Sequence, residues 1–183
     1  MKKILTLAVL AVASLAATAQ TYIGGSVGLG YDIDSEKVNF TLAPEVGYNL
    51  NSKLAIGTTL AYSYNGELKV NDKAQTVQNI FNFDPYVRYT FARVAENKLS
   101  FFCDGTVGVG VVKNEGADAG ATWKVGFKPG MSYALSSKCS LVAHFGFLGY
   151  EGADDNAKVL GQKNKVGFDF GSLNLSFGAY FTF

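Results

Sequence analysis

The sequence predicts an all-β fold, an eight-stranded antiparallel up-and-down barrel, and three observations lead to this fold class. A seven-residue pattern with proline first and tyrosine fifth occurs at Pro44–Leu50, Pro85–Phe91 and Pro129–Leu135, and a degenerate copy, Phe177–Phe183, ends the chain. Apolar residues alternate with small or polar residues in and around each copy, which is the period of a β-strand. Turn-forming residues separate the alternating segments, and long and short connections follow each other in turn.

The chain begins with a predicted signal peptide, residues 1–19. Met1 to Lys3 provide a positively charged start, the run from Ile4 to Ala16 is apolar and uncharged, and Ala17-Thr18-Ala19 forms a small-x-small cleavage site. A retained N-terminal membrane helix is the alternative, but the apolar run is short for a bilayer and no charged stop follows it. No cysteine lies near the cleavage site, so a lipoprotein is not expected.

Residues 20–183 form one predicted domain, because they contain no Pro/Ser-rich linker, low-complexity tract or shift in composition. Without Lys2 and Lys3 the chain has 14 basic and 15 acidic residues, a balance that argues against nucleic-acid binding and against a polybasic membrane patch. Cys103 and Cys139 should fall on strands that are not neighbours, so separate thiols are expected rather than a disulfide, although the sequence leaves their redox state open.

Eight alternating segments lie between the turn clusters, and each ends where Asp, Asn, Gly, Lys or Glu gather. In chain order the predicted strands are Ile23–Tyr31, Val38–Leu50, Leu54–Tyr64, Phe81–Phe91, Leu99–Val111, Trp123–Leu135, Cys139–Phe147 and Leu173–Phe183. The predicted short connections are Asn51–Lys53, Ala92–Lys98 and Ser136–Lys138, and the long ones are Asp32–Lys37, Asn65–Thr76, Lys113–Ala121 and Glu151–Lys165. Each strand reaches or approaches the ~9–11 residues that a tilted membrane-spanning strand needs.

The two faces of these strands differ sharply in composition. One parity carries no charged residue along any strand, and Thr58 is its only Ser or Thr. The other parity consists mainly of Gly, Ala, Ser and Thr and carries six charged residues, Glu45, Asp84, Arg88, Asp104, Lys124 and Lys128. Such a complete separation of charged from uncharged residues indicates that one face of the strands contacts a medium that excludes charge.

Two architectures alternate in this way, and they orient the apolar parity oppositely. A soluble lipocalin-like barrel would turn it inward, but the set is too bulky for the interior of eight strands, and the other parity has too few charges for an ordinary soluble surface. With the apolar parity outward, the strands form a hydrocarbon-facing belt and small residues fill the narrow lumen. No segment after residue 19 approaches the ~18 consecutive apolar residues of a spanning helix, so the sequence predicts a transmembrane barrel.

Aromatic residues of the outward parity gather at the strand ends. Beside the short turns lie Tyr48, Tyr89, Phe91, Phe101, Tyr133, Phe181 and Phe183, and beside the long loops lie Tyr31, Phe40, Tyr62, Tyr64, Phe81, Phe83 and Trp123. Strand propensity explains their number but not this crowding, which is typical of aromatic girdles at the two membrane interfaces. Because short turns of such barrels belong on the periplasmic side and long loops outside, both termini are expected in the periplasm.

Two details conflict with a regular barrel. The three prolines of the repeated pattern cannot donate to a ladder, yet a closed barrel has no edge strand for them, so a bulge or one missing hydrogen bond is expected at each. Phe168 and Phe170 fall on the inward parity of the last strand. A bulge near Gly171, or a strand that starts only after it, would restore the phase.

These residues resemble a known family, the small eight-stranded outer-membrane barrels of OmpA/OmpX type, and especially the outer membrane protein β-barrel domain family of Bacteroidetes-like bacteria. The resemblance rests on the Pro-x-[Val/Met]-x-Tyr-x-[Leu/Phe] strand endings, the Ala-Thr-Ala-Gln export junction and Phe183 as the last residue, and it covers residues 20–183. It implies the outer membrane of a Gram-negative bacterium. It also implies that Phe177, Phe181 and Phe183 belong to the signal read by the barrel-assembly machinery. Unlike the longer OmpA relatives, the sequence stops at the last predicted strand, so a peptidoglycan-binding periplasmic domain is not expected.

A polar cluster is expected inside the barrel. Six inward residues lie at similar heights above the short turns, namely Glu45, Asp84, Arg88, Asp104, Lys128 and His144. Arg88, Asp104 and Lys128 lie on consecutive strands and can pair, while Glu45 approaches across the lumen. OmpA-like barrels similarly carry an internal ion-pair network. An acid/base site or a gated ion path is the functional interpretation, but a salt-bridged plug is favoured because the lumen is too narrow for free diffusion.

Catalysis, metal binding and cofactors are not expected. The lipid-modifying enzymes among small barrels need a His beside a Ser and an acid where a lipid can reach, and the only histidine, His144, points into the lumen. No His/Cys pair has the spacing of metal ligands. The glycines between Gly24 and Gly30 precede no helix that could bind a phosphate.

The expected function is that of an integral outer-membrane barrel with a plugged lumen and a structural or surface-interaction role through four extracellular loops. Expected partners are outer-membrane lipids, the barrel-assembly machinery, and an extracellular protein or surface ligand that the loop residues do not identify. A small porin-like channel for ions or tiny solutes is the alternative. A soluble lipocalin-like carrier and a lipid-modifying enzyme are less favoured.

Overall fold

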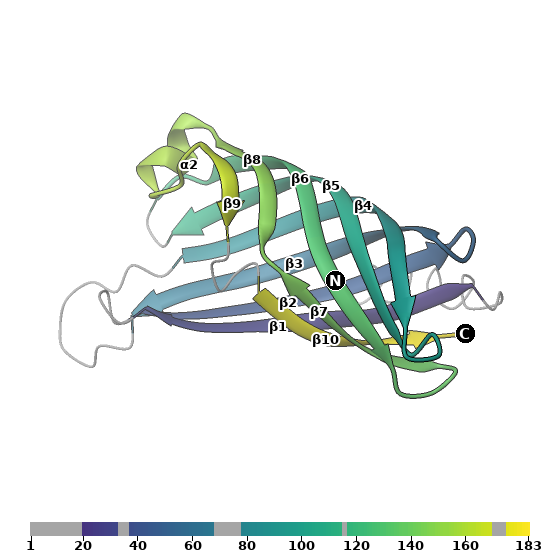
Figure 1. Cartoon of the computed structure of the whole chain (residues 1–183). Helices are drawn as coiled ribbons and strands as arrows, with labels where there is room; N and C mark the ends of the chain where they lie inside the picture. The colour runs from purple at the N-terminus through teal and green to yellow at the C-terminus, as the bar shows by residue number, and fades with distance from the viewer. Residues whose placement is uncertain (1–19, 33–36, 68–77, 115–116, 170–174) are drawn as a thin grey trace, which may run out of the picture.

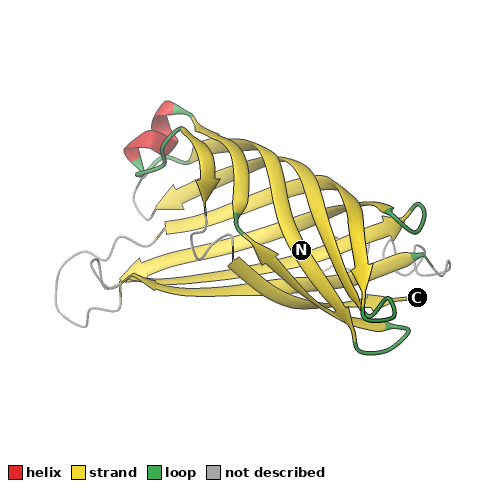
Figure 2. Cartoon of the chain, in the orientation of Figure 1, coloured by secondary structure: helices red, strands yellow, loops and turns green. Residues whose placement is uncertain are grey.

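The computed structural model describes residues 20–32, 37–67, 78–114, 117–169 and 175–183. These residues form a closed antiparallel barrel of eight strands, which confirms the fold class expected from the alternation (Figures 1 and 2). The predicted signal peptide, residues 1–19, lies outside the described residues. Within the described ranges, no helix is long and apolar enough to cross a membrane.

Six strands are continuous and two are each divided in two. The continuous strands are β1 (Thr21–Asp32), β2 (Lys37–Asn49), β3 (Leu54–Glu67), β4 (Gln78–Val94), β5 (Leu99–Asn114) and β6 (Gly120–Ala134). The seventh consists of β7 (Cys139–Phe145) and β8 (Phe147–Ala153), and the eighth of β9 (Lys165–Asp169) and β10 (Leu175–Thr182). The strands pair in chain order, and β10 pairs with β1 to close the barrel.

The two ends of the barrel differ. Tyr22 of β1 pairs with Thr182 of β10, so the first and last strands meet at the end that carries the three short turns. The opposite end carries the strand ends that the long connections join, together with the short helix α2 (Asp155–Val159) (Figure 1). Most of the predicted loop Asn65–Thr76 lies outside the described residues.

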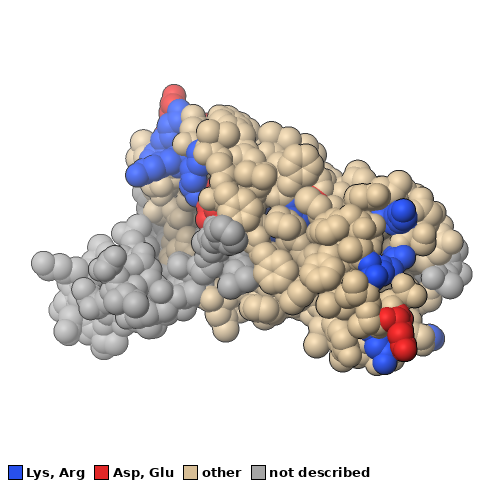
Figure 3. Space-filling model, in the orientation of Figure 1, with Lys and Arg blue, Asp and Glu red and all other residues tan. Residues whose placement is uncertain are grey.

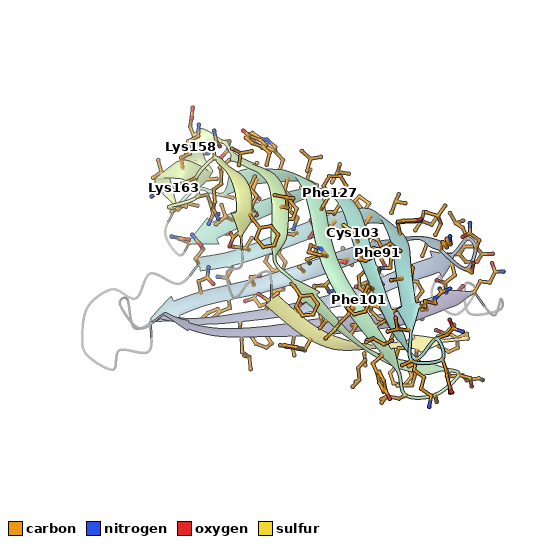
Figure 4. The ribbon with its side chains drawn as sticks, viewed as in Figure 1. Phe91, Phe101, Cys103, Phe127, Lys158 and Lys163 are labelled. Carbon is orange, nitrogen blue, oxygen red and sulfur yellow. The ribbon has the colours of Figure 1, made fainter. Side chains whose placement is uncertain are left out.

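Alternation along the strands separates an apolar outer wall from a polar interior. On β5, Val107 and Val109 are 55% and 61% exposed, whereas Asp104 and Thr106 are buried. The space-filling view shows a wall largely without charge, with charged side chains mostly at the two ends (Figure 3). Phe91 and Phe127 illustrate the exposed aromatic side chains of this wall (Figure 4).

The outward aromatic residues occupy the ends assigned to them from the sequence. Those exposed at the short-turn end are Tyr89, Phe91, Tyr133, Phe181 and Phe183, and those exposed at the long-loop end are Phe81, Phe83 and Trp123. Tyr48, Tyr62 and Tyr64 are only partly buried. Tyr62 packs on Phe81, with ring centroids 4.8 Å apart, and its hydroxyl donates to Asn79.

Each proline interrupts the ladder on one side of its strand. The β2–β3 ladder skips Ala43 and Pro44, and the β4–β5 ladder skips Asp84 and Pro85, while the register on either side is unchanged. Pro129 has no partner on the seventh strand, at the junction between β7 and β8. The expectation of an irregular ladder at each proline is therefore confirmed, and the opposite side of each strand stays paired.

Gly146 interrupts the seventh strand and exchanges its inner and outer faces. Its φ of +80° is one that glycine adopts without strain. The register against β6 changes by one residue at this point, as in a β-bulge. After it, Phe147 is 2% exposed and lines the lumen, whereas Leu148 faces outward. The expectation that Phe147 lies on the apolar outer face is therefore wrong.

The two parts of the eighth strand, β9 and β10, differ in phase. Phe168 of β9 pairs with Leu148 and is exposed on the outer wall, although it lies on the inward parity of the last strand. Phe177 of β10 is exposed as well, and it lies on the opposite parity from Phe168, so the phase is restored between β9 and β10. Phe170 and the bulge expected near Gly171 lie outside the described residues.

The connection predicted from Glu151 to Lys165 is partly structured. Strand β8 continues to Ala153, and Asp154 caps α2 by accepting a hydrogen bond from the Ala157 backbone N–H at 2.7 Å. This bond is the main cause that lowers the pKa of the Asp154 carboxyl. Ala157 is buried against inward-facing residues of the long-loop end, Ile80, Val112 and Ala153. Helix α2 therefore covers part of the barrel mouth.

Candidate functional site in the barrel lumen

Strand alternation turns Glu45 of β2, Arg88 of β4, Asp104 of β5 and His144 of β7 into the lumen, and none of them is more than 7% exposed. Arg88 and Asp104 are direct partners in the β4–β5 ladder. The other two residues approach this pair from more distant parts of the wall. Four of the six residues predicted for the lumen cluster therefore meet in one place.

Arg88 holds Asp104 through two hydrogen bonds. Its Nε donates to Oδ1 at 2.7 Å and its Nη2 donates to Oδ2 at 2.8 Å. Two parallel bonds of this kind match the planar guanidinium to the carboxylate and are among the strongest in proteins. His144 lies beside the same carboxylate, with Nε2 at 3.2 Å from Oδ2.

Glu45 is held by donors from several strands. Arg88 Nη2 lies 3.2 Å from Oε1, and the Tyr180 hydroxyl lies 2.9 Å from each carboxylate oxygen. The Tyr86 hydroxyl also donates to Oε1, and it lies 2.5 Å from the hydroxyl of Tyr22. The lumen network, defined as Tyr22, Glu45, Tyr86, Arg88, Asp104, His144 and Tyr180, thus joins β1, β2, β4, β5, β7 and β10.

Aromatic rings enclose the guanidinium. The Cζ atom of Arg88 lies 3.9 Å from the centroid of the Phe102 ring and 5.1 to 5.8 Å from those of Tyr22, Tyr86 and Tyr180. Phe102 also meets His144 edge-on at 5.4 Å. Cation–π contacts with desolvated rings add to the attraction of the carboxylates.

Glycines on neighbouring strands make room for these rings. A Cβ atom on Gly47 would collide with Tyr22, and one on Gly57 would collide with Tyr86. Phe102 and Tyr180 likewise lie over Gly130 and Gly24. The small residues of the inward parity therefore leave space that large side chains fill at one level of the lumen.

Four aromatic residues of this site were not among the site residues predicted from the sequence. Tyr22, Tyr86, Phe102 and Tyr180 lie on the inward parity, and they are the large aromatic residues of a face otherwise rich in small ones. This exception to the pattern is the signal that could have identified them.

Asp84 and Lys128 lie outside the lumen network. Asp84 pairs with Lys124, with Nζ 2.8 Å from Oδ2. Lys128 is the ladder partner of Asp104, but among the described residues no carboxylate oxygen lies within 4.0 Å of its Nζ. Its side chain lines a cavity of about 140 Å³ toward the long-loop end and a smaller one of about 20 Å³ beside the network.

The chemistry of the network is that of a hydrogen-bonded ionic core. In the part of the chain that the structure describes, no group of three or more His, Cys, Asp or Glu residues is placed to hold a metal ion. His144 Nδ1 has no hydrogen-bond partner there. Cys103 and Cys139 are free thiols on the nonadjacent strands β5 and β7.

A closed barrel with an apolar wall and a charged interior defines an integral outer-membrane β-barrel protein. Residues 4–181 match the family described as outer membrane protein beta-barrel domain, and the chain belongs to this family. The crystal structure of Neisserial surface protein A is similar to this chain, with a TM-score of 0.51 and 15% identity, covering 89% of this chain and 95% of that one.

A structure from the de novo design of transmembrane beta-barrels also matches, with a TM-score of 0.38 and 15% identity over 90% of this chain and 96% of that one. No curated protein matches the sequence.

Proposed function

We propose that this outer-membrane barrel is closed by the lumen network and has a non-enzymatic role, structural and surface-interacting, through the loops at its long-loop end. The contacts of Arg88 Nη2 carry the proposal. This one nitrogen lies 2.8 Å from Asp104, 3.1 Å from the Tyr180 hydroxyl and 3.2 Å from Glu45, so side chains from opposite parts of the wall meet at one point.

Burial explains why such a cluster would stay closed. Separating the guanidinium from its carboxylates inside the barrel would leave charges unpaired in a medium of low dielectric constant, and breaking a buried pair costs about 3–5 kcal/mol. The ring of Phe102 and the three tyrosine rings occupy the space around the charges. A hydrated ion would have to separate these charges and displace these rings.

We propose that the short turns and both termini face the periplasm and that α2 lies outside the cell. The asymmetry of connection lengths supports this orientation, because short turns are periplasmic in barrels of this kind. The exposed aromatic residues at both ends would then contact outer-membrane lipids at the interfaces. Phe177, Phe181 and Phe183, all exposed at the end of the chain, would serve the barrel-assembly machinery.

Planar-bilayer recording tests closure. The wild-type barrel should pass no stable current, and a barrel with Arg88→Ala and Phe102→Ala should show discrete conductance steps. Arg93→Ala is the matched control, since Arg93 lies at a short turn and binds the backbone carbonyl of Ser52. Stable wild-type current would favour the small porin-like channel instead, for which the cavities beside the network would provide the path.

Epitope insertion tests orientation and surface display. Gly161 is a suitable site, because it follows α2 and nothing lies within 4 Å of a Cβ placed there. An epitope after Gly161 should be labelled on intact cells, and an epitope after Ser52 in a short turn should not. The reverse pattern would overturn the proposed orientation.

A further inference from the structure

The larger cavity in the barrel lies between the lumen network and the long-loop end, and its lining is unusually rich in lysine. Four lysines line it, Lys124, Lys128, Lys163 and Lys165, against three carboxylates, Asp84, Glu151 and Asp169. The cavity wall therefore carries one more positive than negative charge.

The carboxylates of the lining are all engaged by two of these lysines. Lys124 pairs with Asp84 at 2.8 Å. Lys165 pairs with Glu151 at 3.2 Å and with Asp169 at 3.1 Å. Among the described residues, neither Lys128 nor Lys163 has a carboxylate oxygen within 4.0 Å of its Nζ. Lys165 and its two carboxylates together carry one negative charge, so the net positive charge of the lining comes from Lys128 and Lys163.

The two lysines lie at different depths. Lys128 also lines the small cavity that contacts Asp104 and His144, so it lies at the inner limit of the space. Lys163 is exposed and follows α2 at the long-loop end, where lysines gather (Figures 3 and 4). An anion entering from that end would meet Lys163 first and Lys128 last, and a positive potential inside low-dielectric walls attracts anions strongly.

Unpartnered polar groups in the same lining indicate that the space holds a polar ligand. Ser176 is 5% exposed, and its hydroxyl has no hydrogen-bond partner among the described residues. Asp84 Oδ1 is buried and equally unpartnered. A hydroxyl and an ammonium can donate to an oxyanion, while a carboxylate oxygen can accept from a protonated one, such as hydrogen phosphate.

The size of the cavity limits the ligand. A cavity needs roughly 10–15 Å³ of space for water centres to hold one water molecule, so about 140 Å³ has room for a cluster of waters or a small polar ligand. That volume suits a small tetrahedral oxyanion with part of its hydration shell.

We propose that the cavity binds a small free oxyanion of the inorganic phosphate class, held at its inner limit by Lys128 and attracted at its mouth by Lys163. The proposed site lies between the lumen network and the long-loop end. Phosphate binding there therefore does not depend on whether ions can pass through the network.

Calorimetric titration with inorganic phosphate tests the proposal, using the full-length barrel in a nonionic detergent at constant ionic strength maintained with chloride. Lys128→Gln should weaken phosphate binding at least tenfold, and Lys163→Gln about two- to threefold, because its charge is exposed and screened. Lys98→Gln, in a short turn at the opposite end, is the matched control and should bind as the wild type does.

Heat-dependent gel migration confirms that each variant is folded. Should Lys128→Gln not fold, Ser176→Ala keeps both lysines and should weaken binding two- to fivefold. Wild-type binding no stronger than that of chloride, or unchanged binding in Lys128→Gln or in Ser176→Ala, would overturn the proposal. So would stronger binding of phosphatidic acid in mixed micelles than of free phosphate, since the ligand would then be a lipid phosphate.

Discussion

Arg88 and Asp104 face each other across the β4–β5 ladder and are joined by two hydrogen bonds of 2.7 and 2.8 Å inside the barrel. Replacement of Arg88 by Ala leaves two buried carboxylates without their cation, so it should destabilise the barrel by about 3–5 kcal/mol. Urea unfolding of the protein in lipid vesicles measures this change. Arg93→Ala should change stability by less than about 1 kcal/mol, because it removes an exposed side chain.

A hydrophobic replacement of the same pair should be less harmful than Arg88→Ala. Arg88→Met with Asp104→Leu removes the cation together with one of its two carboxylates, so only Glu45 stays buried without a cation. Glu45 keeps the hydroxyl groups of Tyr180 and Tyr86 as donors. A double variant as unstable as Arg88→Ala alone would mean that the network's value is not mainly the pairing of buried charge.

Gly47 should not tolerate a side chain, because a Cβ there would meet the ring of Tyr22. Gly47→Ala should cost about 1–3 kcal/mol, as overpacking of a core does. In a Tyr22→Ala background the same substitution should cost much less, and a double-mutant cycle from urea unfolding measures the coupling. Gly105→Ala is the control, since its nearest neighbour would lie 3.8 Å away. Equal costs in both backgrounds would contradict the contact.

Gly146→Ala should weaken the junction between β7 and β8. Its φ of +80° is strained for alanine, and a Cβ would approach the backbone oxygen of Asp169. Gly161 has a φ of +88° with nothing within 4 Å of a Cβ, so Gly161→Ala carries only the backbone strain of about 1–2 kcal/mol. Thermal unfolding should therefore give Gly146→Ala a lower midpoint temperature than Gly161→Ala. The opposite order would count against the bulge.

The cap of α2 should depend on pH in a defined direction. The pKa of Asp154 is lowered by its bonds to backbone N–H groups, so its contribution is present above the unfolded pKa of about 4 and is lost as pH falls through the lower folded pKa. Hydrogen exchange of the Ala157 amide should therefore accelerate at acid pH. Asp154→Ala should remove this protection at all pH values, whereas Asp155→Asn should preserve it. A pH-independent Ala157 rate would contradict the cap.

Strand alternation was enough to place most of the barrel and the charged residues of the site. Glu45, Arg88 and Asp104 meet because parity and height along the strands determine which side chains share the lumen. Parity could not show that Lys124, rather than Lys128, pairs with Asp84, because the choice depends on how long side chains cross the lumen.

The bulge at Gly146 could not be predicted from the alternation of apolar and small residues either. Glycine is common on the inward face, so one glycine with positive φ is not distinguishable from the others by sequence. Beyond this bulge, the residues of β8 lie on the faces opposite to those that alternation along β7 predicts. This shift explains why Phe147 lines the lumen.

The chain has two arginines, Arg88 in the lumen network and Arg93 at a short turn, and they provide the most direct test of a closed interior. Nitrogen-15 NMR of the folded barrel should show two side-chain Nε–H signals. The account predicts that the Arg88 signal exchanges with water far more slowly than the Arg93 signal, because its proton is bound to Asp104 and enclosed by aromatic rings. Equally rapid exchange at both arginines would show that water reaches the centre of the lumen freely and would contradict closure by the network.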